Sequence, residues 1–145
     1  LPNQWWVEAG NWQDEALEAA GGRNVFGVDP EQGYLVVSTE QLVRVAAEAE
    51  VFITNVPSLD ALEALLPVES LPAFATGRVF HVHGRVDAER DAYDWYETPL
   101  VRPDLLLEDL IAILHPDPEE GPRPGLLAPV AAPVVAPAMR DPSAR

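Results

Sequence analysis

The sequence predicts an α/β fold, with a mainly parallel sheet flanked by helices, in one folded unit that spans residues 1–116. Short apolar runs typical of strands alternate with amphipathic helical patterns along this part of the chain. Of the 145 residues, 48% are hydrophobic and 23% are charged, which are the proportions of a globular domain. Eight of the fifteen prolines fall at or after residue 116, so residues 117–145 are predicted to be a flexible Pro/Ala-rich tail.

The helices are predicted from the residues that begin and end them. The first runs from Trp12 to Ala20 and ends at a glycine pair. Ser38 and Gln41 form a capping box for the second, whose buried residues are expected to be Leu42, Val43, Ala46 and Ala47. The third follows Ser58 as its cap, with an apolar stripe of Leu59, Leu62, Leu65 and Leu66. The last begins with Pro103 and ends at His115 and Pro116.

The strands are predicted at residues 5–7, 50–54 and 78–83, between these helices. Strands and helices that alternate in this way predict a parallel sheet, on which ligands bind beyond the carboxyl ends of the strands. Residues 84–102 follow the last of these strands and show no clear period. Because irregular connections of this length are uncommon in compact domains and often functional, a ligand is expected there.

Composition excludes several functions. The net charge is −15, and no basic stripe interrupts it, so a nucleic-acid partner is not expected. The chain has no cysteine, which excludes disulfides, thiol catalysis and cysteine-ligated metals. Residues 1–115 hold 20 acidic and 6 basic side chains, hence −14, and the remainder contributes −1. Catalytic motifs such as G-x-S-x-G and the P-loop are missing, so an enzyme and a resident cofactor are not expected.

Several stretches in order resemble one protein family. Residues 20–26 (AGGRNVF), 37–42 (VSTEQL) and 50–55 (EVFITN) are similar to the carboxyl-terminal lobe of class III substrate-binding proteins of ABC importers, which serve uptake of ferric siderophores, haem and cobalamin. The similarity continues through residues 71–82 (LPAFATGRVFHV) and closes with residues 102–116 (RPDLLLEDLIAILHP), which look like the family's terminal helix.

The resemblance implies a single Rossmann-like lobe that captures an iron complex, a siderophore or haem, and delivers it to the ABC permease subunits. Cobalamin is the alternative ligand, and an enzyme half-domain of the chelatase or nitrogenase kind, or a sensor tethered by the tail, is the alternative function. Family members hold the ligand between two lobes. The full-length protein is therefore expected to contain an N-terminal lobe that is missing from this sequence. The implied location is the periplasm or the cell surface, with a lipid anchor as one option.

The candidate ligand-binding residues are aromatic, charged or imidazole side chains. Trp5, Trp6 and Trp12 are expected either to form an aromatic wall at the ligand or to fill the core. Tyr34 matches an aromatic position of the cobalamin-binding relatives, where it stacks, hydrogen-bonds or ligates iron; otherwise it is a loop residue. His81 and His83 share one strand face and could chelate a metal, although packed histidines are more common, and His83 is nearer the ligand edge.

The irregular segment and the second helix complete the candidates. Asp94, Trp95 and Tyr96 resemble a ligand-loop passage of the cobalamin-binding relatives, and Arg85 could pair with an anionic iron chelate. Packing of these rings on the last helix is the alternative. Glu40 matches a glutamate that, in those relatives, docks onto permease arginines. Without that partner, Glu40 is an ordinary acidic residue in a first helical turn.

Overall fold

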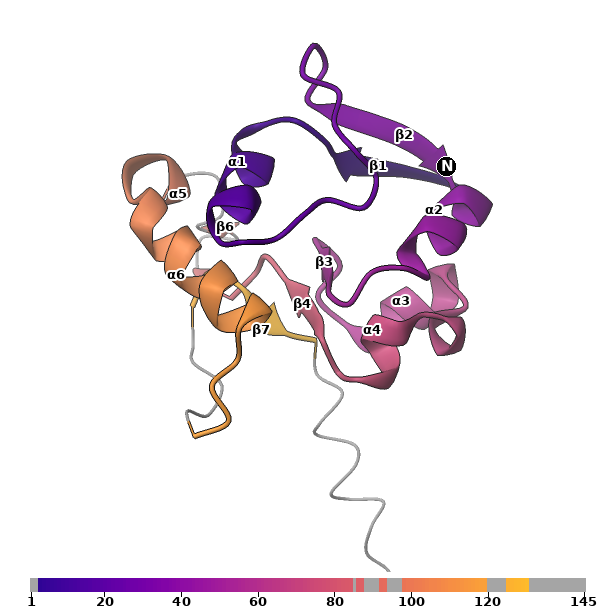
Figure 1. Cartoon of the computed structure of the whole chain (residues 1–145). Helices are drawn as coiled ribbons and strands as arrows, with labels where there is room; N and C mark the ends of the chain where they lie inside the picture. The colour runs from indigo at the N-terminus through magenta and orange to yellow at the C-terminus, as the bar shows by residue number, and fades with distance from the viewer. Residues whose placement is uncertain (1–2, 85, 88–91, 94–97, 120–124, 131–145) are drawn as a thin grey trace, which may run out of the picture.

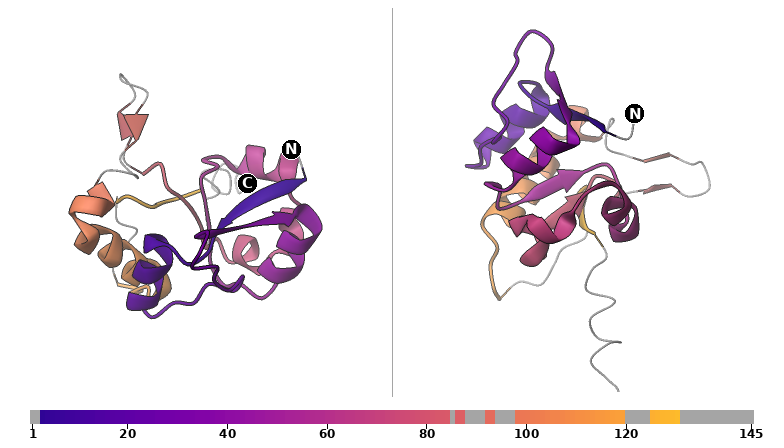
Figure 2. Two further views of the ribbon diagram at one scale, coloured as in Figure 1. Left: turned by 90° about the horizontal axis from the view of Figure 1, so that it is seen from above. Right: turned by 90° about the vertical axis from the view of Figure 1, so that its right-hand side faces the viewer.

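The computed structural model describes residues 3–84, 86–87, 92–93, 98–119 and 125–130. Its strands are β1 (Gln4–Glu8), β2 (Tyr34–Ser38), β3 (Phe52–Thr54), β4 (Val79–His81), β5 (Val86–Asp87), β6 (Ala92–Tyr93) and β7 (Ala128–Pro129). Its helices are α1 (Trp12–Ala19), α2 (Thr39–Ala46), α3 (Leu59–Leu65), the 3₁₀ turn η1 (Val68–Ser70), α4 (Pro72–Ala75), α5 (Thr98–Val101) and α6 (Pro103–Leu114). Figures 1 and 2 show α1, α5 and α6 on one side of the strands β3 and β4, with α2, α3 and α4 on the other.

The α/β composition is confirmed, but the strand pairing is mixed rather than mainly parallel. β3 and β4 pair in parallel, and β7 joins the other edge of β4 in the antiparallel direction. β1 and β2 form a separate antiparallel ribbon, in which Trp6 lies opposite Val36. The prediction failed here because periodicity locates strands along the chain but does not specify their partners.

The predicted helix caps are confirmed. The Ser38 hydroxyl accepts from the Gln41 amide at 3.1 Å, and the Gln41 side chain accepts from the Ser38 amide at 2.8 Å. Ser58 accepts from the Ala61 amide at 3.2 Å at the start of α3. Pro103 is the first residue of α6, where its missing N–H removes no helical hydrogen bond.

Two hydrophobic clusters hold the elements together. The first lies among α2, α3, η1, α4 and β4, and its buried residues are Leu42, Ala46, Leu62, Leu66, Val68, Leu71, Ala73, Val79 and Val130. The second lies between α1 and α6, and its buried residues are Ala20, Val82, Leu106, Leu110, Ile113, Leu126 and Leu127. Two residues of the predicted buried stripes, Ala47 and Leu65, are exposed because they face away from both clusters.

Residues 125–130 correct the expectation that everything after residue 116 is a spacer. Leu126 is 2% exposed, and β7 pairs with β4 at the edge of the sheet. The Asp109 carboxylate on α6 accepts from the amides of Leu126 at 2.7 Å and Leu127 at 3.2 Å. An edge strand tolerates Pro129, which has no N–H to donate to the ladder. The many prolines led to the prediction of a flexible tail here, although residues 125–130 include a strand and complete both clusters.

The segment 84–102 also differs from the prediction of an irregular connection. Within its described residues, β5 and β6 pair as a short antiparallel ribbon, and α5 precedes α6. Two-residue strands are too short for a hydrophobic period to be detected in the sequence.

Candidate ligand-binding surface

The β1–β2 ribbon has one covered face and one open face. Trp5 and Val7 point from β1 into the first hydrophobic cluster. The Trp5 indole also donates to the Thr39 hydroxyl at 2.8 Å, which ties β1 to the start of α2. Because successive residues of a strand point to opposite faces, Trp6 must point outward. Of the two predicted roles for Trp5, the structure shows core packing.

The open face carries an aromatic pair. Trp6 is 70% exposed and stacks on Tyr34, with ring centroids 4.7 Å apart and planes inclined by 30°. Val36 lies opposite Trp6 in the ribbon and is 47% exposed. We call these three residues the Trp6 face. Val36 was not among the candidates from the sequence. It lies two residues after Tyr34 in the same strand, and residues two apart in a strand point to the same face, so this position could have been predicted.

A polar network fixes the chain just after β1. Asn11 caps α1 by accepting from the Gln13 amide at 2.9 Å, and its amide group donates to the Gly33 carbonyl at 3.0 Å and to the Glu8 carboxylate. Asn24 donates to the Glu8 carbonyl at 2.6 Å and to the Asp14 carboxylate at 3.0 Å. These bonds join the end of β1, the start of α1 and the segment before β2. The end of the ribbon that carries Tyr34 is therefore held in place.

Gly10 lets this network close. Its φ of +95° is in the left-handed region, and an added Cβ would approach the Asp29 carbonyl carbon to 3.0 Å. The Gly10 amide also donates to the Asp14 carboxylate. A side chain at position 10 would therefore strain the backbone and push residue 29 away.

Trp12 does not join the Trp6 face. It is the first residue of α1 and packs, partly buried, against the second hydrophobic cluster together with Ala16 and Leu17. Its location is that of a core residue, which was the second of its two predicted roles.

His81 and His83 are brought together at the carboxyl end of β4, with ring centroids 5.9 Å apart. The His83 amide donates to the His81 Nδ1 at 3.1 Å, and the His83 Nε2 lies 2.7 Å from the Asn55 carbonyl, to which it donates. These bonds engage the His81 Nδ1 and the His83 Nε2 within the protein. Burial, and then the neighbouring His83, lower the pKa of His81 below its usual value.

Among the described residues, no group of three or more His, Asp or Glu side chains is arranged so that it could hold a metal ion. Arg85, Asp94, Trp95 and Tyr96 lie outside the described residues, so their predicted contact with a ligand stays a prediction.

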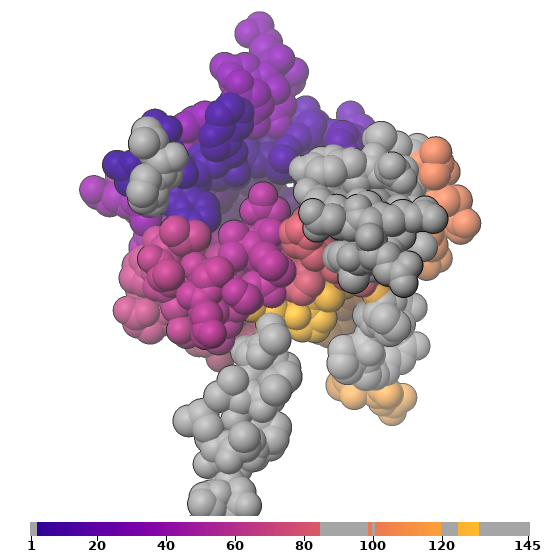
Figure 3. Space-filling model, turned by 180° about the vertical axis from the view of Figure 1, so that it is seen from behind, coloured from indigo at the N-terminus to yellow at the C-terminus, as the bar shows by residue number. Residues whose placement is uncertain are grey.

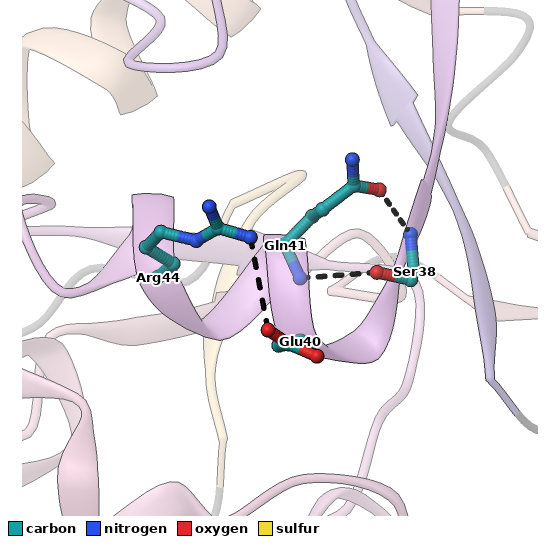
Figure 4. Close-up of polar contacts among 4 residues, drawn as sticks. All are labelled: Ser38, Glu40, Gln41 and Arg44. Carbon is teal, nitrogen blue, oxygen red and sulfur yellow. Dashed lines mark hydrogen bonds and ion pairs between the residues drawn. The ribbon is translucent and has the colours of Figure 1, made fainter.

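Glu40 projects from the start of α2 (Figure 4). Its side chain is 90% exposed, and its carboxylate takes no part in the Ser38–Gln41 capping box. Arg44 lies one turn along the same helix, with a nitrogen–oxygen distance of 4.0 Å to this carboxylate. An exposed pair at this separation is weak, so the carboxylate remains available to a partner.

Comparisons with known proteins return no family: no family model, no curated protein and no solved structure matches the chain. Across the part of the chain that the structure describes, none of the helices combines the length and apolar character needed to cross a membrane. The features of the described residues that bear on function are the Trp6 face and the exposed Glu40 carboxylate.

Proposed function

We propose that residues 1–116, together with residues 125–130, form the carboxyl-terminal, Rossmann-like lobe of the solute-binding component of an ABC importer, which captures an iron complex, a siderophore or haem, and delivers it to the membrane permease. The observation that carries this proposal is the Trp6–Tyr34 stack, whose tryptophan is 70% exposed. A large aromatic ring left in water offers apolar area and a π face to a planar ligand.

Binding at the Trp6 face would be non-covalent. A macrocycle or an aromatic chelate stacks on the Trp6 ring, while the Tyr34 hydroxyl offers one donor and one acceptor beside it. The polar network around Asn11 and Asn24 keeps this end of the ribbon ordered before a ligand arrives, which lowers the entropic cost of binding. The second wall of the site belongs to the other lobe of the proposed two-lobed protein.

Glu40 supports a separate docking role in the same proposal. Tyr34 begins β2 and Ser38 ends it, so Glu40 lies beyond the far end of the strand. Four residues of strand span about 13 Å. A permease that pairs with the Glu40 carboxylate therefore contacts a different part of this lobe from the ligand.

The ligand test titrates the two-lobed protein with haemin, ferrioxamine B and cyanocobalamin and measures the heat of binding by calorimetry. We expect one iron complex to bind, and Trp6→Ala to weaken it about 2- to 10-fold, since a stacking pair contributes ~0.5–1.5 kcal/mol. Val28→Ala is the matched control, because Val28 is 65% exposed and lies outside the Trp6 face. If cyanocobalamin is the only one of the three that binds, the ligand is a corrin and not an iron complex. If none of the three binds, the transport proposal is contradicted.

The docking test measures uptake by cells that carry variants of the two-lobed protein. We expect Glu40→Gln to reduce uptake and Glu40→Arg to abolish it, with ligand affinity unchanged, because charge pairs across an interface set approach rate and register. Glu48→Gln is the control, since Glu48 is an exposed acidic residue just beyond the same helix. Normal uptake by the Glu40→Arg variant would contradict the docking role and would mean that Glu40 is only an acidic residue in a first helical turn.

A further inference from the structure

The open face of the β1–β2 ribbon carries one charged residue beside its aromatic stack. Exposed and half-buried residues alternate along β1, so Glu8 points to the same side as Trp6. The register places Glu8 directly opposite Tyr34, and these two side chains therefore share one face of the ribbon. Among the residues of this face, Glu8 is the only one that is charged at neutral pH; the full set is Gln4, Trp6, Glu8, Tyr34, Val36 and Ser38.

The Trp6–Tyr34 stack is a diagonal contact across the ribbon. Tyr34 lies opposite Glu8, and Trp6 lies two positions earlier in β1, yet the ring centroids are 4.7 Å apart. Long aromatic side chains can bridge such diagonal positions, whereas directly opposite residues have Cβ atoms only about 4.5–5.5 Å apart. A ligand group that lies on these rings is therefore also within reach of the Glu8 carboxylate.

The negative charge of Glu8 is not neutralised by the described part of the chain. Its carboxylate accepts from the side-chain amide of Asn11, which is a neutral donor. The salt bridges of the described residues lie in α2 and at the start of α6, so none of them involves Glu8. A carboxylate has about four lone-pair sites, and one amide donor leaves it able to accept further hydrogen bonds.

The backbone around Glu8 is held in place at the surface. Asn24 donates to the Glu8 carbonyl at 2.6 Å, and the amide of the next residue, Ala9, donates to the Gly33 carbonyl at 3.0 Å. Figure 3 shows the indigo and purple atoms of the N-terminal part, to which the ribbon belongs, at the top of the molecule above the magenta surface. A charged group on a fixed and exposed backbone loses little freedom when a ligand binds.

We propose that the Trp6 face and Glu8 together select an iron complex that carries a positively charged amine, of which a ferric trihydroxamate with a free ammonium group is the simplest example. This inference rests on the proposed function, because it names the class of ligand held at the same surface. The ammonium group is attracted by the π faces of the rings and by the Glu8 carboxylate. The same carboxylate repels the propionates of haem and the oxygens of an anionic chelate. The net charge of −15 favours the approach of a cation.

The test compares two ligands that differ in this charge. Ferrioxamine B has one free ammonium group, and its N-acetyl derivative has the same iron centre but is neutral. Calorimetric titration of the two-lobed protein should show that ferrioxamine B binds about 3- to 10-fold more tightly. Raising the salt concentration from about 0.01 M to about 1 M should reduce this difference, because the Debye length falls from about 30 Å to about 3 Å.

Glu8→Gln identifies the residue responsible for the preference. Glutamine keeps an oxygen that accepts from Asn11 but has no charge. We therefore expect the affinity for ferrioxamine B to fall to that of the N-acetyl derivative, whose own affinity stays unchanged. Glu63→Gln is the matched control, because Glu63 is an exposed acidic residue on α3 and not on the ribbon, and it should keep the preference. Circular dichroism checks that both variants are folded.

The possible outcomes separate this inference from the proposed function. Equal affinities for the two ferrioxamines, or a preference that persists in Glu8→Gln, would overturn the role of Glu8 and leave the capture of an iron complex in place. Tighter binding of haemin than of ferrioxamine B would also overturn it, since haemin carries propionates. If neither an iron complex nor cyanocobalamin binds, the proposed function fails and this inference fails with it.

Discussion

The β3–β4–β7 sheet and the β1–β2 ribbon differ in how they are covered. β4 lies between β3 and β7. Val79, its first residue, is 5% exposed in the first hydrophobic cluster, and Val82, just after it, is 7% exposed in the second. The ribbon buries Trp5 and Val7 on one face but leaves Trp6 and Val36 in water on the other. Substitutions in the sheet should therefore change stability, and substitutions on the open face of the ribbon should change binding.

The largest expected effect is in the sheet region. Leu126→Ala should lower the free energy of unfolding by about 3 kcal/mol, because a fully buried leucine loses its packing and leaves a cavity. Urea denaturation followed by circular dichroism measures it. Leu65→Ala is the matched control: Leu65 is 40% exposed, so its loss should cost no more than about 0.5 kcal/mol. Equal small effects would show that residues 125–130 are a spacer after all.

The two adjacent tryptophans compare the faces of the ribbon directly. Trp5→Ala should destabilise the fold by about 3 kcal/mol, since it removes packing and the hydrogen bond to Thr39. Trp6→Ala should cost about 1 kcal/mol, the value of its stack on Tyr34. Thermal or urea unfolding of both variants gives the difference. A larger loss for Trp6→Ala would reverse the assignment of covered and open faces.

The smallest expected effect is the pH dependence at the end of β4. The lowered pKa of His81 means that the unfolded chain binds more protons between the folded value and about 6.5. His81 therefore adds stability that is present above pH 6.5 and is lost as the pH falls through the folded pKa. Protonation of Nδ1 also removes the acceptor of the His83 amide.

His81→Asn tests this effect, because asparagine offers an acceptor oxygen but does not titrate. We expect urea unfolding at pH 7 and pH 5 to show a smaller loss of stability for His81→Asn than for the unchanged chain. The same pH dependence in both proteins would exclude His81 as its source.

The candidate site was predictable only as a set of residue types. Trp6 and Tyr34 were both candidates from the sequence, but so were Trp5 and Trp12, which the structure packs into the two clusters. Side chains alternate along β1, so Trp5 and Trp6 must point to opposite faces of the ribbon. Which of the two faces the core depends on where the ribbon packs against the rest of the chain. The contact between Trp6 and Tyr34 depends on the antiparallel register, which brings together residues 28 positions apart.

The local features could be predicted from short stretches of sequence: the capping box at Ser38, the cap at Ser58 and the start of α6 at Pro103. These depend on hydrogen bonds and backbone angles within a few residues, so a short stretch of chain contains their cause. The antiparallel ribbon, the open Trp6 face and the packing of residues 125–130 became visible only in the folded chain. Each of these requires surfaces from distant segments to be buried together, and burial is a property of the assembled core.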